Sequence, residues 1–243
     1  MNIPIRESFL PHISLADNDV HLWRINLDVP ARRQSNLDTL LSQPECDRAA
    51  RFQFARDRHR FVVSHAILRL TLSRYLNCDP EQIQYQIQEN GKPLLANMPQ
   101  LHFNLAHSHE LALIAVTQLG EIGVDVEYIR PLDDMEQLAR QCFSMQEFLQ
   151  FKDLPASERH QAFFTCWTRK EAFLKALGFG LAYPLENFTV SLLRNEPGRL
   201  VMVAGNPDEA AKWTLQGIDI DPDYAAAFAL RVANPIVKYM DWV

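Results

Sequence analysis

Residues 123–127 read Gly-Val-Asp-Val-Glu, a short pattern that predicts a strand with two unlike faces. Side chains alternate along a strand, so Asp125 and Glu127 point one way while Val124 and Val126 point into a core. Two like charges on one strand face repel each other. Because that repulsion is tolerable in water or around a cation, the pattern fits either a solvated acidic surface or a metal site.

Residues 167–175 read Trp-Thr-Arg-Lys-Glu-Ala-Phe-Leu-Lys and predict a helix. Residues four apart stack on one helix face, so Glu171 and Lys175 are neighbours. Such a pair is commonly a surface ion pair, but here it lies beside an arc of aromatic and aliphatic residues. Lys170 falls within that arc, so we interpret it as structural, in need of an acidic partner or a path to the surface.

If the strand end meets the helix, three carboxylates and an ammonium converge. A few carboxylates, water and the substrate's own oxygens are the usual way for a protein to hold Mg²⁺ against a phosphate. The two stretches together therefore predict a metal site formed by Asp125, Glu127 and Glu171.

The composition sets outer limits on the function. The 243 residues are 47% hydrophobic, which is enough for one large core or two small ones, and the net charge of −6 argues against a general nucleic-acid surface. The N-terminus has no apolar signal region, and no run approaches a membrane span of about 20 residues. We therefore expect a cytoplasmic protein. The cysteines are scattered, which predicts neither a zinc site nor a disulfide framework: Cys46, Cys78, Cys142 and Cys166.

A faint internal repeat suggests two halves of the same plan. Helices are predicted from about 56 to 77 and 161 to 177, and their apolar stripes superimpose at an offset of 102 residues, Phe61 onto Phe163 and Arg69 onto Glu171. Three strands are predicted after each helix, at 83–88, 101–105 and 111–116 and again at 188–193, 213–218 and 224–230.

The repeat predicts an α+β, two-layer fold with two pseudo-symmetric halves, each a long helix packed on an antiparallel three-stranded meander. We place the halves at 1–118 and 119–243, with the active site at the seam, since clefts between domains favour ligands. Both sides of the cleft then lie in one chain, which favours a monomer.

A connector at about 132–161 is predicted to be helical. Ser144 with Glu147 makes a capping box, and Phe143, Phe148 and Leu149 give the segment apolar content. It either offers a surface to a partner or packs against the second half.

Three further features are candidates for binding a phosphorylated ligand. The turn at 90–93 reads Asn-Gly-Lys-Pro and holds Lys92 rigidly, and His107 lies between two predicted strands. Arginines, which bind phosphate in a bidentate manner, cluster at Arg48, Arg51, Arg56, Arg58 and Arg60. A solvated turn lysine, a turn histidine and a solvated helix start are the alternative interpretations.

Together these stretches resemble an Sfp-type 4′-phosphopantetheinyl transferase, of the holo-acyl-carrier-protein synthase superfamily. The family pattern is a G-[IV]-D-x-E strand, a W-[ST]-x-K-E-A-x-x-K helix, a G-K-P turn and an F-N-x-S-H-S loop. The resemblance covers about 48–193, with the loop at 103–108 reading Phe-Asn-Leu-Ala-His-Ser. Ala106 stands where the family usually has serine, so one hydroxyl contact to the cofactor is expected to be missing.

The resemblance implies that coenzyme A binds between the halves, with Mg²⁺ on the three acids. Its phosphates would be contacted by His107 and Lys175, and its 3′-phosphate end by Arg60 and Arg48. Ser108 would also belong to the residues that bind the cofactor. Gly91, Lys92 and Pro93 would line the adenine.

The implied reaction is attack of a carrier-protein serine on the β-phosphate of coenzyme A, with release of 3′,5′-ADP. Lys175 and His107 would assist at the phosphates, and Glu171 is the candidate base, as well as a metal ligand.

The implied partner is an apo acyl, polyketide or peptidyl carrier protein, which is typically acidic and helical. Docking is expected near Lys175, Leu177 and Phe179 and on the connector around Phe143 and Phe148. Two other classes remain open: a different Mg²⁺-dependent enzyme that cleaves a diphosphate, and a non-catalytic module that binds coenzyme A or carriers.

Overall fold

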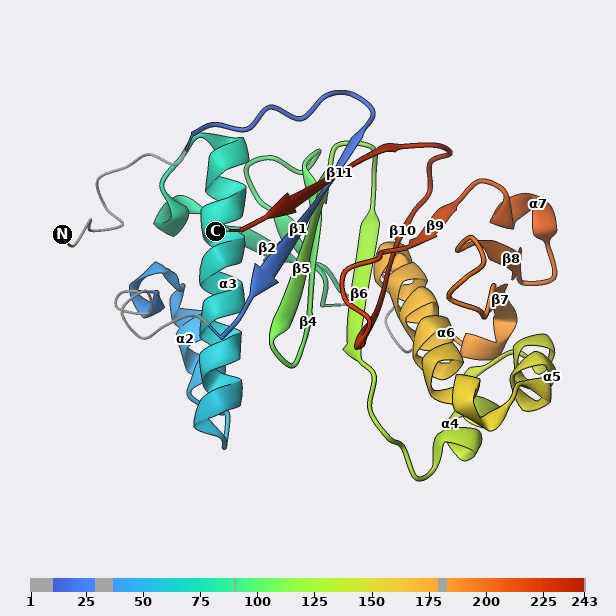
Figure 1. The fold of residues 1–243 in the computed structure, drawn as a ribbon. Coiled ribbons are helices and arrows are strands. Elements are labelled where there is room, and N and C mark those ends of the chain that lie inside the picture. The colour runs from blue at the N-terminus through green and yellow to red at the C-terminus, as the bar shows by residue number, and fades with distance from the viewer. Residues whose placement is uncertain (1–10, 29–36, 90, 179–182, 243) are drawn as a thin grey trace.

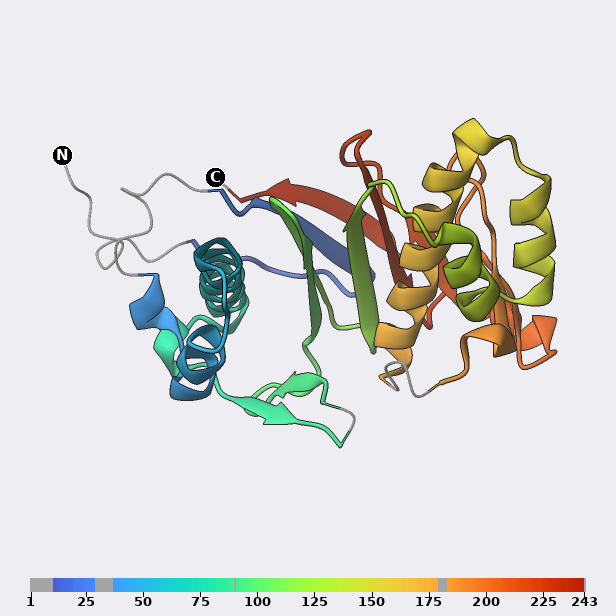
Figure 2. The ribbon, with the colours of Figure 1, turned by 90° about the horizontal axis from the view of Figure 1, so that it is seen from below.

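The computed structural model describes residues 11–28, 37–89, 91–178 and 183–242. Figures 1 and 2 show two sheets with one long helix on either side of them, in the layer order helix, sheet, sheet, helix, and shorter elements beyond the second long helix. The helices are α3 (Ala55–Leu76) and α6 (Ala156–Leu177), close to their predicted positions. The α+β class and the two pseudo-symmetric halves are therefore confirmed.

The first sheet has the strand order β11-β1-β5-β4, in which only β11 and β1 are parallel. Its strands are β1 (Asp19–Asn26), β4 (His102–Ser108), β5 (Leu111–Thr117) and β11 (Ile236–Asp241). The second sheet has the antiparallel order β6-β10-β9. Its strands are β6 (Ile122–Tyr128), β9 (Thr214–Gly217) and β10 (Tyr224–Leu230).

The predicted three-stranded meanders are wrong in one respect, because the first strand of each does not join the other two. That first strand forms a separate two-stranded hairpin with a short strand that follows it in the chain. These hairpins are β2 (Tyr85–Ile87) with β3 (Pro93–Leu95), and β7 (Phe188–Val190) with β8 (Leu200–Val203).

The third strand of each sheet comes from before the long helix. In the first half β1 pairs with β5, and in the second half β6 pairs with β10 in the same antiparallel sense. Both strands are buried along most of their length, although β1 lies inside its sheet and β6 lies at the edge of its own, where it contacts β4. Each half is thus a strand, a long helix and two hairpins.

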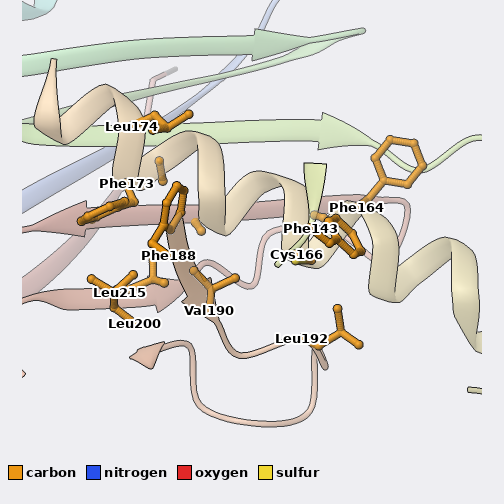
Figure 3. Packing of buried hydrophobic residues seen from close by; sticks show 14 of the residues in the cluster. Phe143, Phe164, Cys166, Phe173, Leu174, Phe188, Val190, Leu192, Leu200 and Leu215 are labelled. Atoms are coloured by element: carbon orange, nitrogen blue, oxygen red, sulfur yellow. The ribbon is translucent and has the colours of Figure 1, made fainter. Parts of the chain in front are cut away.

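The two sheets pack face to face over an apolar layer. Leu22 and Leu113 from the first sheet meet Val124, Val126 and Phe228 from the second. Another core lies between the first sheet and α3, and a third lies around α6, where Figure 3 shows the rings of Phe173 and Phe188 packing together. Strand β5 supplies alternate residues to two of these layers and is buried on both faces.

A buried ion pair recurs at the equivalent place in both halves. Lys170, fully buried, donates to Glu147 at 2.7 Å and to the Phe188 carbonyl at 2.9 Å, which confirms its structural interpretation. In the first half Arg69 donates to Glu45 at 2.8 Å and to the Ile83 carbonyl at 3.1 Å.

Each acid also belongs to a capping box at the start of a short helix, with Ser42 before α2 (Gln43–Ala49) and Ser144 before α5 (Met145–Asp153). Arg69 therefore corresponds to Lys170, and the prediction that it corresponds to Glu171 is wrong by one residue. The long helices also end equivalently, at left-handed Asn77 and Gly178.

The connector is helical, as predicted, with α4 (Met135–Cys142) preceding α5. Phe143 is buried between these helices, where its ring stacks on Phe163 and meets Phe151 edge to face. It cannot offer a surface to a partner, so that part of the prediction is wrong. The exposed apolar side chains of α5 are Met145, 73% exposed, and Leu149, 57% exposed.

The remaining short helices are η1 (Asp38–Leu40), η2 (Pro80–Gln82), η4 (Leu185–Asn187) and α7 (Pro207–Ala210). The four cysteines are free thiols, as expected. None of the helices within the described ranges combines the length and the apolar content that a membrane span requires.

The contact between β6 and α6 depends on a residue without a side chain. A Cβ atom at Gly123 would lie 2.0 Å from the Ala172 carbonyl oxygen and 2.4 Å from the Ala176 nitrogen. The same face of β10 carries only Ala225, Ala227 and Ala229, all packed in the cluster around α6. Small residues on both strands therefore let the helix backbone lie directly on the sheet.

We predict that Gly123→Ala lowers the free energy of unfolding by roughly 3 kcal/mol or more, because backbone atoms of α6 must move. Gly217→Ala is the matched control, since the nearest atom to its added Cβ lies at 3.7 Å, and it should change stability by less than about 1 kcal/mol. Urea unfolding of both variants measures the difference. Equal stabilities would contradict the close approach.

Candidate active site

The seam between the halves lies where edge strand β4 meets edge strand β6. Side chains of β4 bond the backbone of β6: Asn104 Oδ1 accepts from the Val124 amide at 2.9 Å, and Ser108 Oγ accepts from the Tyr128 amide at 3.1 Å. The contacts keep the same spacing and order on both strands, so β4 and β6 run in the same direction. This registers the two halves against each other at the point where the acids lie.

The acids of β6 face α6, as the alternation predicted. Asp125 is 5% exposed, and its Oδ1 accepts from Lys175 Nζ at 2.7 Å. Lys175 also donates to the Val124 carbonyl at 3.2 Å. Glu127 Oε2 accepts from Ser108 Oγ at 2.8 Å, so Ser108 holds a carboxylate as well as joining the strands.

Negative charge at this site exceeds what the protein compensates. Asp125 Oδ2 and Glu171 Oε1 are buried, and neither has a hydrogen-bond partner in the described part of the chain. Burial and the adjacent carboxylates of Asp125 and Glu127 raise the pKa of Glu171 to about 7, although Lys175 opposes the shift. Burial also raises the pKa of Asp125 and, with the Asp125 charge, that of Glu127.

These residues fit a divalent cation that takes only part of its coordination from the protein. Buried carboxylate oxygens without partners are a suitable donor set for Mg²⁺, which keeps several waters and binds substrate oxygens. Among the residues that the structure describes, no group of three or more acidic, histidine or cysteine side chains is placed so that it could hold a metal ion by itself. The nearest positive charge to Asp125 is Lys175, on the helix that carries Glu171.

A cluster of positive charge lies next to the acids. His107 keeps an exposed edge, yet partial desolvation and the charges of Lys175, Arg48 and Arg60 lower its pKa. Arg48 lies over the Phe61 ring, at 5.2 Å from its centroid. The structure therefore brings together four of the predicted phosphate-binding residues, from α2, α3, β4 and α6.

Arg60 is held by acids rather than free. Its guanidinium donates to both Asp28 oxygens, at 3.3 and 3.5 Å, and lies 3.6 Å from Glu110. Both acids are exposed, with 48% and 60% of their side chains accessible, so solvent screens these pairs. A phosphate competes with such pairs more readily than with buried ones.

The predicted turn at 90–93 forms, although residue 90 lies outside the described residues. Gly91 adopts a φ of 85°, a left-handed conformation that suits glycine, and Pro93 begins β3. Lys92 is buried and donates to the Glu121 carboxylate, the Ile122 carbonyl and the Lys175 carbonyl. Its ammonium thus anchors the hairpin to the start of β6 and the end of α6, and its role in binding a cofactor stays a prediction.

Sequence reasoning missed Glu121 and Asn104, which position the site without forming it. Hydrogen bonding from His102 and Lys92 lowers the pKa of Glu121 to about 2. The signal was available, since Glu121 directly precedes the acidic strand and Asn104 stands in the quoted loop. Ala106 packs in the layer between the sheets, on the same β4 face as Asn104 and Ser108.

The raised pKa of Glu171 predicts a pH dependence of stability. In its unfolded state this carboxyl has its ordinary value of 4.5, so its stabilising contribution is present below that pH and is lost as pH rises through about 7. Without a divalent cation, Glu171→Gln should therefore gain stability over the unsubstituted protein from pH 5 to pH 8, by on the order of 2 kcal/mol.

Thermal unfolding in EDTA across this pH range measures the effect, with the exposed Glu158→Gln on the same helix as the control. Parallel curves for Glu171→Gln and the unsubstituted protein would show that the carboxyl is not perturbed.

Two family models match the chain. One is described as the 4′-phosphopantetheinyl transferase superfamily and matches 121–229, and the other as the N-terminal part of 4′-phosphopantetheinyl transferase and matches 30–119. The apo-ACPS structure from Chronobacterium ammoiniagenes is similar over 44% of this chain and 92% of its own, at 22% identity and a TM-score of 0.32.

Curated relatives match over most of their length. The 4′-phosphopantetheinyl transferase HetI of Nostoc sp. is 39% identical over 92% of both chains. The 4′-phosphopantetheinyl transferase psf-1 of Bacillus pumilus is 33% identical over 84% of this chain and 85% of its own. Sfp of Bacillus subtilis is 28% identical over 85% and 90%. The chain therefore belongs to the 4′-phosphopantetheinyl transferase superfamily.

Proposed function

We propose that this transferase is Mg²⁺-dependent, binds the diphosphate of coenzyme A at the β6–α6 seam, and releases 3′,5′-ADP as it modifies a carrier-protein serine. The observation that carries the proposal is the pairing of buried, unpartnered carboxylate oxygens with an adjacent cluster of cations. A diphosphate bridged by a cation needs both kinds of group at once.

Asp125, Glu127 and Glu171 would hold the Mg²⁺. When bound, this ion would neutralise charge on the diphosphate and on the leaving group. Asp125 and Glu127 are placed by β6, and the Ser108 hydroxyl fixes the orientation of Glu127. Glu171 is placed by α6, so the site requires the strand and the helix to stay in contact.

The cations would divide the phosphates of coenzyme A among them. Lys175 donates to Asp125, and the charge of Lys175 acts on His107; both residues would contact the diphosphate. Arg48 and Arg60 are contributed by the first half and would bind the 3′-phosphate end, where Arg60 exchanges its exposed acids for the ligand. The hairpin at 91–93 would line the adenine.

Glu171 is the proposed base for the serine hydroxyl. A carboxyl with a pKa near 7 is both able to accept a proton at neutral pH and able to release it again. Its Oε1 has no partner in the described chain, which leaves that oxygen available to a ligand or a hydroxyl. Metal ligation and proton transfer would then use different oxygens of one carboxylate.

The test is the intact mass of an apo acyl or peptidyl carrier protein after incubation with this protein, coenzyme A and Mg²⁺. We expect a gain of one phosphopantetheine, with an equal amount of 3′,5′-ADP formed only when the carrier is present. EDTA should abolish the gain, and Asp125→Asn should lower kcat/KM by at least about a hundredfold. Glu158→Gln is the control substitution.

Formation of 3′,5′-ADP without a carrier would favour a hydrolase of diphosphates. Coenzyme A binding without transfer to any of several carriers would favour a binding module. Equal activity in EDTA would reject the metal site.

We propose that the carrier docks where α6 ends and on the exposed face of α5. Leu177, at the end of α6, and Phe148, on α5, are partly exposed, and Met145 and Leu149 are the exposed apolar side chains of α5. Phe179, the remaining predicted contact, lies outside the described residues. The cytoplasmic location and the monomeric state stay predictions.

Met145→Glu and Leu149→Glu should each raise the KM for the carrier about tenfold or more, since an acidic partner meets a new like charge. The KM for coenzyme A should not change. Ile236→Glu, an equally exposed apolar position on β11, is the matched control. An unchanged carrier KM in both α5 variants would place the docking surface elsewhere.

A further inference from the structure

A cleft of about 740 Å³ lies in the second half, on a different side of α6 from the acids. It is formed by α6, the loop between β7 and β8, and strands β8, β9 and β10. Arg169 lines it, and at about 100° per residue Arg169 and Glu171 point roughly 200° apart on the helix. Nothing in the proposed transfer reaction uses this cleft.

Arg169 is a buried guanidinium that forms no ion pair with a described carboxylate, although the charge of Glu196 acts on it and opposes the lowering of its pKa. It is 2% exposed, and within the described ranges no carboxylate lies at ion-pair distance from it. Nη1 donates to the Ser191 carbonyl at 2.8 Å and to the Ser191 hydroxyl at 3.0 Å, and Nη2 donates to the Glu196 carbonyl at 3.2 Å. Burial lowers its pKa, but a guanidinium stays charged at neutral pH.

The donors that remain on Arg169 belong to Nε and Nη2, the two nitrogens at one edge of the guanidinium. Nε has no partner in the described chain, and Nη2 makes only one of its two possible hydrogen bonds. Nε–H and Nη2–H lie side by side, and this is the fork that binds a carboxylate through two parallel hydrogen bonds.

A second polar group without a partner lies one turn away. Thr165 is 6% exposed, also lines the cleft, and its Oγ1 makes no hydrogen bond to any described residue. Residues four apart stack on one helix face, so Thr165 and Arg169 lie on the same side of α6. Buried polar groups are normally satisfied, so two adjacent exceptions in one cleft point to a missing polar ligand.

The rest of the cleft favours a ligand with an apolar body. Leu200, Trp213 and Leu215 line it, and Figure 3 shows Leu200 and Leu215 on the strand side of α6. Its volume lies within the range of small-molecule sites. Access to the guanidinium passes Gly217, where an added Cβ would lie 3.7 Å from Nη2 and where the absent side chain leaves room.

The charge around the cleft is consistent with an anion of low charge. Arg194 is paired with Asp219 at 3.1 Å, and the Glu196 carboxylate accepts from the amides of Leu192 and Leu193. Arg199 at the rim is exposed. With Arg194 paired, Arg169 and Arg199 stand against the Glu196 charge, and the one net positive charge that remains suits a single carboxylate better than a multiply charged phosphate.

We propose that this cleft is a second binding site, which takes a small monocarboxylate with an aliphatic or aromatic body. The carboxylate bonds the Nε–Nη2 edge of Arg169 and accepts from the Thr165 hydroxyl, and the body packs on Leu200, Trp213 and Leu215. The site is separate from the one proposed for coenzyme A and does not depend on it.

The test compares acids with their neutral analogues on the full chain. Hexanoate and benzoate are titrated beside hexanamide and benzamide, with ligand-observed NMR as the measurement. We expect each acid to bind at least tenfold more tightly than its amide and more tightly than inorganic phosphate. Equal affinity of acid and amide, or tighter binding of phosphate, would overturn the proposal.

Variants locate the binding. Gly217→Leu fills the space before the guanidinium and should weaken hexanoate binding at least tenfold. Lys212→Leu, the matched control, adds the same side chain on an exposed turn outside the cleft and should leave hexanoate binding unchanged. Thr165→Val removes the hydroxyl at equal size and should weaken binding severalfold. Circular dichroism confirms folding of each variant.

Coenzyme A supplies the remaining control. Binding of hexanoate that persists at saturating coenzyme A supports a separate site, even for a protein that fails to modify carriers. Displacement of hexanoate by coenzyme A would overturn the proposal.

Discussion

The rest of the structure depends on the close approach of β6 to α6, and that approach depends on Gly123. Without a Cβ at this position the helix backbone lies directly on the strand. The positions that follow on the same strand face are Asp125 and Glu127, so their carboxylates are carried to the helix surface. A larger residue at 123 would separate the elements, and with them the acids from Glu171 and Lys175.

The approach brings like charges together, which lowers the stability of the protein. The raised pKa values and the unpartnered oxygens of the site are the signs of this repulsion. Three carboxylates have raised pKa values, and two buried oxygens lack partners in the described chain. Lys175 compensates part of this charge through Asp125. A cation bound there would compensate the negative charge that Lys175 leaves. The excess of carboxylates therefore both destabilises the cation-free site and gives the site its affinity for a cation.

Local patterns in the sequence predicted the parts of the fold that depend on local spacing. Alternation along 123–127 and the four-residue spacing of Glu171 and Lys175 gave the correct faces, because both follow from backbone geometry alone. Pairing between distant segments was not predicted: β1 comes before the first long helix, and its place beside β5 depends on tertiary contacts. Phe143 was misplaced for the same reason, since apolar content does not say which side chains become buried. Register along the long helices was decided by the ion pairs of Arg69 and Lys170 rather than by the apolar stripes.

The two halves share one scaffold but contribute opposite charges to the site. In each half a buried cation of the long helix, Arg69 or Lys170, donates to the acid of a capping box. None of the charged residues of the site takes part in these two ion pairs. The second half places its carboxylates and Lys175 at the seam, and the first half places Arg48, Arg60 and His107 where the charge of Lys175 reaches His107. A bound diphosphate with its cation would then be attracted to both halves at once. Neither half alone carries all the charged groups that a diphosphate and its cation would need. The side-chain hydrogen bonds of Asn104 and Ser108 fix the register of β4 against β6, so they also fix the position of one half's charged groups relative to the other's.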